Sequence, residues 1–470
     1  MSFALLAVIL PVLGAVGLVL IGGPRAGAVI NIVISIAGFV LTLAVWRSGQ
    51  VGPLAALFGV LSGFVGLTTA IANVRLVMLE GGRLSAWRWR CYHALFQLLL
   101  GLSLLGLYAD NIGLLWLSLA GETMVTALGI SLYRTPEAMK AAWGYLLLGG
   151  GGMALALFGT LLVYLAVQST SGAAQVGMSF AALSGYAARG DQSLICLGFI
   201  LILFGYGAKV LLVPLHGWLS GSYADGPFML TGIVQGLFTN VALLAILRFR
   251  HVAVIASGSW LPDSILLAFA IALLFFVAFA MARQGNILRF LGFLASQQAA
   301  IALFAFGIGG QVAIFGGLLQ MLMQTLLKSG AVLVLVRTVG WGKGGYAFSN
   351  LRGLPDFNKY VGWVFGAAVF TWSGLPPSGL FVGEFIIIRQ TILRNPWMCV
   401  PLSIGLMLCA MPVLRYAARI LCVPALVEKR QKTGWDVNLA VLHLALLLIL
   451  AFAMPVPLVN LLTDVAGALQ

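Results

Sequence analysis

Long apolar runs recur along the whole chain and are separated by short polar segments. Each run is long enough to cross about 30 Å of hydrocarbon. The runs lack the two-residue alternation of a transmembrane β-barrel, so the expected spanning elements are α-helices. Fourteen spans are predicted, at residues 3–22, 27–46, 54–78, 91–108, 112–132, 142–167, 193–219, 228–247, 262–282, 288–308, 311–337, 360–388, 397–420 and 438–460.

The composition agrees with this pattern. Of the 470 residues, 61% are hydrophobic and 8% are charged, whereas about a quarter of a soluble domain is charged. The chain is therefore expected to be an all-α integral membrane protein with no sizeable water-soluble domain. Its five cysteines are scattered, with no C-x-x-C pair and no histidine nearby in a ligand spacing. Neither a metal centre nor an iron–sulfur cluster is indicated, and no cofactor is expected.

The formal net charge of +14 raises the alternative of a nucleic-acid partner, but the basic residues lie in short loops between spans. With the spans placed as above, eighteen Lys and Arg residues fall on one side of the membrane and six on the other. This asymmetry is typical of membrane orientation. It predicts a multi-pass protein of the cell inner membrane with both termini on the outer, periplasmic side and no nucleic-acid partner. The first apolar run is interpreted as a retained helix rather than a signal peptide.

Two lysines, Lys209 and Lys328, are assigned to no loop, and two acids, Glu122 and Glu384, are likewise assigned to the membrane interior. An ionisable group near the middle of a bilayer costs several kcal/mol unless it is paired, hydrated or neutral, so each is a functional candidate. For Glu122 the alternative is a structural ion pair that clamps two helices. For Lys328 the alternative is a side chain that reaches the interface.

The surroundings of Lys209 indicate an interrupted span. Gly205 and Gly207 precede the lysine and Pro214 follows it, and proline opposes a regular helix because it lacks a backbone N–H. Such a break leaves backbone groups that need protein or water nearby, which predicts a polar cavity. His216 lies two residues past the proline, as a proton relay or as an interfacial hydrogen-bonded side chain.

The twelfth predicted span repeats this design. Pro376 and Pro377 lie beside glycines, and Glu384 follows on the same helix. Two interrupted helices in corresponding halves of a chain are typical of an inverted-repeat transporter.

Three stretches also resemble a known family: the antiporter-like subunits shared by respiratory complex I, Mrp cation/proton antiporters and group 4 membrane-bound hydrogenases. The resemblance covers about residues 90 to 395 and is closest to the hydrogenase-4 or formate-hydrogenlyase component F type. The stretches are GETMVTALGISLYRTPEAMKAAWGYLLL, FGYGAKVLLVPLHGWL and SGLPPSGLFVGEFIIIRQ.

The resemblance implies a subunit of about 14 helices with two inverted five-helix repeats and interrupted helices 7 and 12. Residues 1–90 would form helices 1–3, 91–250 the first half-channel, 251–420 the second, and 421–470 the last helix. It also implies a proton pathway along Glu122, Lys209, Lys328 and Glu384, in which Glu122 and Lys209 form a charge pair that opens and closes. Accessory positions of the pathway would be His216, Asn240, Gln324 and Gln297.

Several positions depart from the family pattern. Asn240 and Gln324 stand where many members have a titratable side chain, and Tyr223 stands in a turn that usually holds a histidine. Gly144 replaces a lysine that is common in the hydrogenase branch. Each change removes a titratable group, although Asn240 and Gln324 can still hydrogen-bond water.

The expected function is therefore that of a proton-translocating subunit of a larger membrane-bound oxidoreductase, with other membrane and peripheral subunits, protons and the lipid bilayer as partners. No intrinsic redox catalysis is expected, because the sequence has no Gly-rich dinucleotide loop, haem motif or cluster ligands. The alternatives are a stand-alone or Mrp-like cation/proton antiporter, a membrane partner for inorganic-carbon uptake, and a structural subunit whose channel has degenerated.

Overall fold

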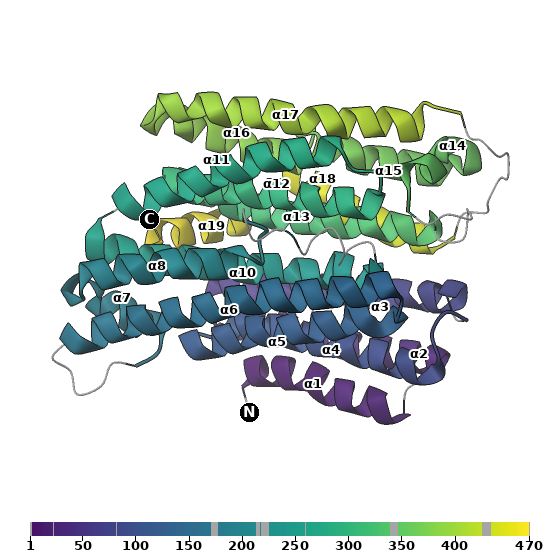
Figure 1. Ribbon diagram of the computed structural model, residues 1–470, viewed down its shortest axis with the longest axis horizontal. Helices are drawn as coiled ribbons and strands as arrows, with labels where there is room; N and C mark the ends of the chain where they lie inside the picture. Colours follow the sequence, from purple (N-terminus) through teal and green to yellow (C-terminus); the bar gives the residue numbers. More distant parts are fainter. Residues whose placement is uncertain are drawn as a thin grey trace.

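The chain folds into a bundle of roughly parallel and antiparallel helices (Figure 1). The computed structural model describes residues 2–21, 23–80, 82–170, 177–212, 217, 225–258, 260–338, 346–424 and 434–469. Within these ranges there is no β-strand, and the extended pairing is limited to two isolated bridges, Asn111 with Ser179 and Asn286 with Ala347. The prediction of an all-α fold is confirmed.

The two halves of the chain form two halves of the bundle, and α10 lies between them (Figure 1). The first half contains α1 (Phe3–Ile21), α2 (Pro24–Ser48), α3 (Pro53–Glu80), α4 (Ala86–Tyr108), α5 (Ile112–Ile130), η1 (Ser131–Tyr133), α6 (Pro136–Thr170), α7 (Phe180–Tyr186), η2 (Ala187–Arg189) and α8 (Gln192–Gly207). The second contains η3 (Leu230–Val234), α10 (Gln235–Ser257), α11 (Trp260–Ala282), α12 (Ile287–Ile308), α13 (Gln311–Thr338), η4 (Phe348–Leu351), α14 (Leu354–Phe357), α15 (Lys359–Trp372), α16 (Gly379–Arg394), α17 (Pro396–Leu421), α18 (Asp436–Phe452) and α19 (Val456–Ala468).

Eleven helices in the described residues are long and apolar enough to cross a membrane, and the bent pair α18 and α19 raises this number to twelve. The expected fourteenth span corresponds to that pair, whose axes differ by 77°. The seventh and twelfth expected spans are not single long helices, because α8 stops at Gly207 and α15 is separated from α16. The exact number of fourteen is thus not confirmed, whereas the interruption of the twelfth span is.

The break after α8 falls at the lysine that the sequence singled out. The helix ends at Gly207, and residues 208–211 continue as a turn in which Leu211 has a positive φ of 69°. The Lys209 N–H donates to the Tyr206 carbonyl at 2.9 Å, so the ammonium-bearing residue lies in the turn rather than in the helix. Pro214 lies outside the described residues.

Glycines bring α8 unusually close to α6. A Cβ at Gly205 would lie 2.5 Å from the backbone nitrogen of Ala156 and 2.6 Å from the carbonyl oxygen of Gly152. Two helical turns earlier on α8, a Cβ at Gly198 would lie 2.8 Å from the Gly159 carbonyl oxygen. Small residues at such a seam allow two backbones to touch in a membrane, where packing drives helix association. This contact fixes where the end of α8 presents Lys209.

The second break separates α15 from α16 at residues 373–378. Gly374 has a positive φ of 68°, which glycine adopts without a steric penalty. The Ser378 hydroxyl then accepts a hydrogen bond from the Phe381 N–H at 3.1 Å and caps the start of α16.

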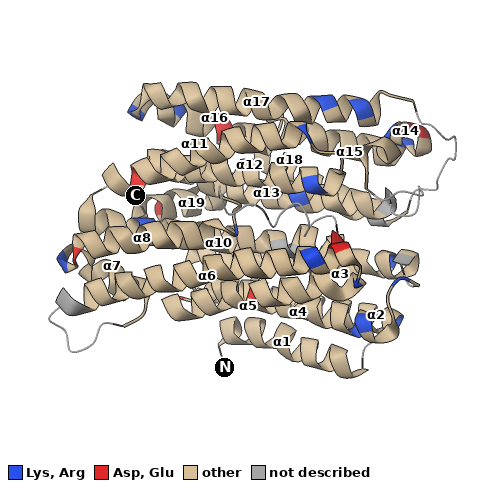
Figure 2. Cartoon of the chain, in the orientation of Figure 1, with Lys and Arg blue, Asp and Glu red and all other residues tan. Residues whose placement is uncertain are grey.

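The innermost helices are α12 and α13, whose most apolar segments are completely buried. The next most buried helix is α10. In the outer helices α1, α2 and α17, only 22%, 33% and 28% of the most apolar segment is buried, as expected of lipid-facing helices. Charged residues are sparse along the ribbon (Figure 2). A polar side chain in the interior of such a bundle needs a hydrogen-bond or charge partner.

Candidate functional site

Glu122 lies in the middle of α5, a helix that begins where the Asn111 side chain accepts hydrogen bonds from the N–H groups of Gly113 and Leu114. Its carboxylate is fully buried. The Tyr145 hydroxyl, from α6, donates to Oε1 at 2.6 Å, and the Thr126 hydroxyl, one turn along α5, donates to the same oxygen at 2.9 Å.

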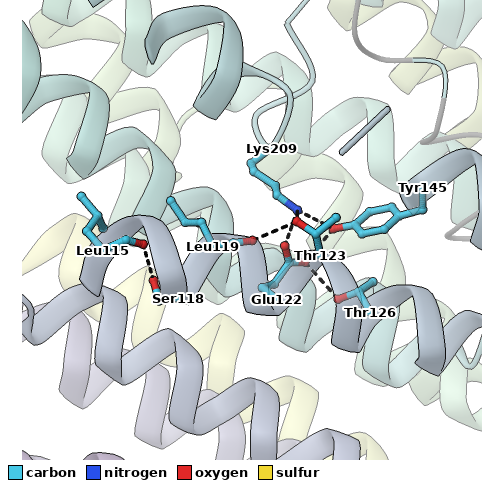
Figure 3. Close-up of polar contacts among 8 residues, drawn as sticks. All are labelled: Leu115, Ser118, Leu119, Glu122, Thr123, Thr126, Tyr145 and Lys209. Carbon is cyan, nitrogen blue, oxygen red and sulfur yellow. Dashed lines mark hydrogen bonds and ion pairs between the residues drawn. The ribbon is translucent and has the colours of Figure 1, made fainter. Parts of the chain in front are cut away.

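Lys209 completes this cluster from the turn after α8 (Figure 3). Its Nζ donates to Oε2 of Glu122 and, at 2.6 Å, to the Thr123 hydroxyl. It also lies 3.2 Å from the Tyr145 hydroxyl and 4.9 Å from the centre of that ring. The side chains of the lysine and the glutamate are 3% and 0% exposed. The expected pairing of Glu122 with Lys209 is confirmed.

The chemistry of this cluster follows from its burial. Two opposite charges away from water attract each other strongly, and a buried charge that loses its partner is costly. Because Lys209 sits in a turn, a change in that turn alters the distance between ammonium and carboxylate without unfolding a helix. The arrangement can therefore hold a proton on the lysine when the pair is closed and release it when the pair opens.

Lys328 lies on α13 beside a small cavity with room for about one water molecule. Polar atoms of Gln324, Thr325 and Ser329 share the lining with the lysine. Gly236 also lines the cavity, and a Cβ there would lie 2.6 Å from Lys328 Nζ, so a larger residue would displace the end of the lysine side chain. This glycine follows η3, a π-helical turn, and such turns are frequent at functional sites. Lys328 is 7% exposed, which does not favour an interfacial side chain.

Asn240 lies in the interior near this cavity. Its side-chain amide donates to the Thr325 hydroxyl at 2.7 Å, and its Oδ1 is buried without a hydrogen-bond partner. Thr325 also lines the cavity of Lys328. An unsatisfied buried oxygen at the edge of a polar cavity is a natural acceptor for a water molecule.

A stripe of amides connects the neighbourhood of Lys328 with Glu384. Gln320, Gln324 and Lys328 follow one another at four-residue intervals and so share a face of α13. Gln320 donates to the side-chain oxygen of Gln298 on α12, and both amides lie beside the carboxylate of Glu384 on α16. The stripe thus leads from the second buried lysine to the second buried acid.

The break between α15 and α16 accommodates that acid. A Cβ at Gly374 would lie 2.6 Å from Oε2 of Glu384, so the carboxyl group packs directly against the backbone of the break. Glu384 is 9% exposed. Both interrupted spans therefore present an ionisable side chain at the interruption, as the sequence predicts.

The accessory pathway residues predicted from the sequence lie in different places. Asn240 and Gln324 lie near Lys328, as described above. His216 and Tyr223 lie outside the described residues. Gln297 is buried, with its side-chain oxygen unpartnered, and the amide that lies beside Glu384 is that of its neighbour Gln298.

Sequence reasoning missed the neutral side chains that lie beside the buried ionisable residues. Tyr145 and Gln320 have no charge, and nothing in their local sequence distinguishes them from other polar residues in apolar helices. Helical spacing offers one signal, because Gln320 lies two turns before Lys328 on the same face.

Comparison with known proteins agrees with the resemblance noted in the sequence. A hydrogenase-4 component F homolog from Methylacidiphilum infernorum (isolate V4) is 38% identical over 358 residues, which cover 76% of this chain and 75% of that protein. NADH-quinone oxidoreductase subunit N from Desulforudis audaxviator is 25% identical over 266 residues, or 56% of this chain and 51% of that protein.

Solved structures share the fold. A chain of the membrane-bound sulfane sulfur reductase, an archaeal respiratory membrane complex, superposes with a TM-score of 0.85 at 19% identity and covers 100% of this chain and 98% of its own. A chain of the Mrp complex from Dietzia sp. DQ12-45-1b superposes with a TM-score of 0.83 at 17% identity, covering 99% and 97%.

The family model for NADH:quinone oxidoreductase/Mrp antiporter transmembrane proteins matches residues 109–410. This range includes α5 through most of α17, and with it all four buried ionisable residues. The chain is a multi-pass membrane protein and belongs to the NADH:quinone oxidoreductase/Mrp antiporter transmembrane family.

Proposed function

We propose that this chain moves protons across the membrane as a subunit of a multisubunit oxidoreductase of the hydrogenase-4 or complex I type. The observation that carries the proposal is the buried ion pair between Glu122 and Lys209 at the break of α8. A structural clamp needs no such break, whereas a pair that opens and closes needs one partner on a movable turn.

The proposed route has two parts. In the first, opening of the Glu122 pair lets Lys209 release its proton towards the interior. In the second, Lys328 takes up a proton in its cavity and passes it along the Gln324 and Gln320 face of α13 to Glu384. Each transfer breaks one N–H or O–H bond and forms another, so no redox chemistry is required of this chain.

The two interrupted helices support the division into two inverted half-channels, residues 91–250 and 251–420, with residues 1–90 and 421–470 outside them. Each proposed half contains one buried lysine and one buried acid. We further propose that the chain resides in the cell inner membrane with both termini on its outer side. In support, eighteen Lys and Arg residues of the predicted loops fall on one side of the membrane and six on the other.

The electron-transfer reaction belongs, in this proposal, to partner subunits. The similarity to a hydrogenase-4 component F homolog favours partners of that kind. Purification of the complex and identification of its redox subunits tests this part directly.

Proton translocation tests the role of the ion pair. The purified complex is reconstituted in proteoliposomes with a pH-sensitive dye, and electron transfer is started with the donor that its redox subunits accept. Glu122→Gln is expected to abolish the pH change while the complex still assembles. Glu137→Gln, the same substitution at an exposed position in the first turn of α6, is the matched control and is expected to pump normally.

Normal pumping by Glu122→Gln contradicts the proposal and favours a structural subunit. Cation/proton exchange by this chain reconstituted alone, without redox partners, would instead identify an autonomous antiporter.

A further inference from the structure

A buried histidine outside the proposed pathway lies next to the cavity of Lys328. His443, on α18, is fully buried and connects three helices. Its Nδ1 lies 2.7 Å from the Ser329 hydroxyl of α13, and its Nε2 lies 2.8 Å from the Thr68 hydroxyl of α3. Ser329 also lines the cavity of Lys328.

Both hydroxyls already have acceptors on their own helices. The Ser329 hydroxyl donates to the Thr325 carbonyl at 2.7 Å, and the Thr68 hydroxyl donates to the Val65 carbonyl at 3.0 Å. While these bonds are made, each hydroxyl oxygen offers only lone pairs to the imidazole. Two N–H groups, as in the charged ring, then satisfy both contacts.

A neutral ring is accommodated equally simply. It has one N–H and one lone pair, so one hydroxyl must turn from its backbone carbonyl towards the ring nitrogen. One further group favours the charged form, because the Phe64 ring lies 4.8 Å away, centre to centre, and the face of an aromatic ring attracts a cation. The hydrogen-bond geometry of the site therefore fits His443 with or without the extra proton, and one hydroxyl rotation separates the two arrangements.

We propose that His443 is a proton-carrying residue that exchanges protons with Lys328 through the Ser329 hydroxyl. This inference rests on the proposed function and adds one proton-carrying residue to the proposed route. A proton that leaves the Lys328 ammonium enters the cavity and binds Ser329 Oγ, while the hydroxyl's own proton moves to Nδ1 of the neutral ring. Lys328 ends neutral, Ser329 is unchanged, and His443 ends as an imidazolium.

The charged groups on the helices around α18 fit this exchange. Lys328 is on α13 and Glu384 is on α16, both of which pack against α18. Two positive charges on neighbouring positions of the dry interior repel each other, so a proton on His443 favours a neutral Lys328. The histidine therefore keeps the transferred proton inside the bundle while the lysine is ready to accept the next one.

The test compares variants of the complete complex in the proteoliposome assay. His443→Gln keeps hydrogen-bonding capacity but cannot carry a charge, and it is expected to slow proton translocation about 10²-fold. Thr68→Val, which removes the hydroxyl at nearly constant shape, is expected to slow it as well, whereas Thr68→Ser keeps the hydroxyl and is expected to pump normally. Pumping at the wild-type rate by His443→Gln overturns the inference and assigns the residue a structural role.

Two comparisons keep the result decisive. If His443→Gln fails to assemble, equal pumping by Thr68→Val and Thr68→Ser overturns the inference. Lys328→Met distinguishes a failure of the proposed function from a failure of the His443 relay. If it pumps normally, the proposed function fails. If it stops pumping while His443→Gln continues, only the relay fails.

Discussion

Removal of the charge on Glu122 is expected to destabilise the protein by about 3–5 kcal/mol, the cost of leaving a buried partner uncompensated. In Glu122→Gln, the amide oxygen can still accept from Tyr145 and Thr126, which lie 2.6 and 2.9 Å from Oε1. The amide nitrogen then replaces Oε2 and faces the Lys209 ammonium, so that two donors meet.

A second variant at the same carboxylate gives a smaller expected loss of stability for comparison. Thr126→Val removes one hydrogen bond to the same carboxylate and is expected to cost about 1.5–3 kcal/mol. The combined variant Glu122→Gln with Lys209→Met removes both charges. It should recover most of the loss, since replacement of a buried pair by uncharged groups is often nearly neutral.

The assay is equilibrium unfolding of the purified protein by titration from mild detergent into sodium dodecyl sulfate. The coupling free energy is obtained from the two single variants and the combined variant. A coupling near zero, with the combined variant as unstable as the sum of the single ones, would refute the argument that the two charges depend on each other.

Three further predictions concern other parts of the bundle. Gly205→Ala places a methyl group 2.5 Å from the Ala156 backbone; it should destabilise the protein by about 1–3 kcal/mol in the same titration, and an unchanged midpoint would contradict the close helix contact. Gln298→Leu should slow proton translocation because it removes the amide that accepts from Gln320 beside Glu384, whereas Gln297→Leu should have a smaller effect; equal effects would contradict the assignment. Burial raises the pKa of Asp225 above its ordinary value of 3.8, so folding binds a proton there and stability should fall as pH rises through the range just above 3.8; Asp225→Asn should lose this part of the pH dependence of thermal unfolding, and an unaltered pH profile would contradict it.

The ion pair shows what the sequence could predict. Glu122 and Lys209 are conspicuous because charges inside apolar spans are rare, and the glycines before Lys209 indicate the break. The family resemblance implies that these two residues form a charge pair, and the structure confirms it.

The neutral partners could not be predicted in the same way. Gln297 and Gln298 are adjacent, and a difference of 100° around the helix axis decides which one reaches Glu384. His443 contacts Thr68 across 375 positions of sequence. Such a contact depends on how α3, α13 and α18 pack together, and no local pattern encodes that packing.

The number of spans illustrates a different limit. Hydropathy detects an apolar segment whether or not it is a continuous helix, so the stretch 438–460 was expected to be one span. In the structure α18 ends at Phe452 and α19 departs at 77°. Pro455 lies between them, and proline opposes continuation of a helix.

The central claim is that protonatable side chains in the interior belong to one connected polar route. A density map of the purified complex that resolves ordered water tests it most directly. The account predicts water in the Lys328 cavity, at Oδ1 of Asn240, and in a file that joins the Lys209 turn to Glu384. A map in which closely packed aliphatic side chains separate these residues, with no ordered solvent between them, would contradict the claim.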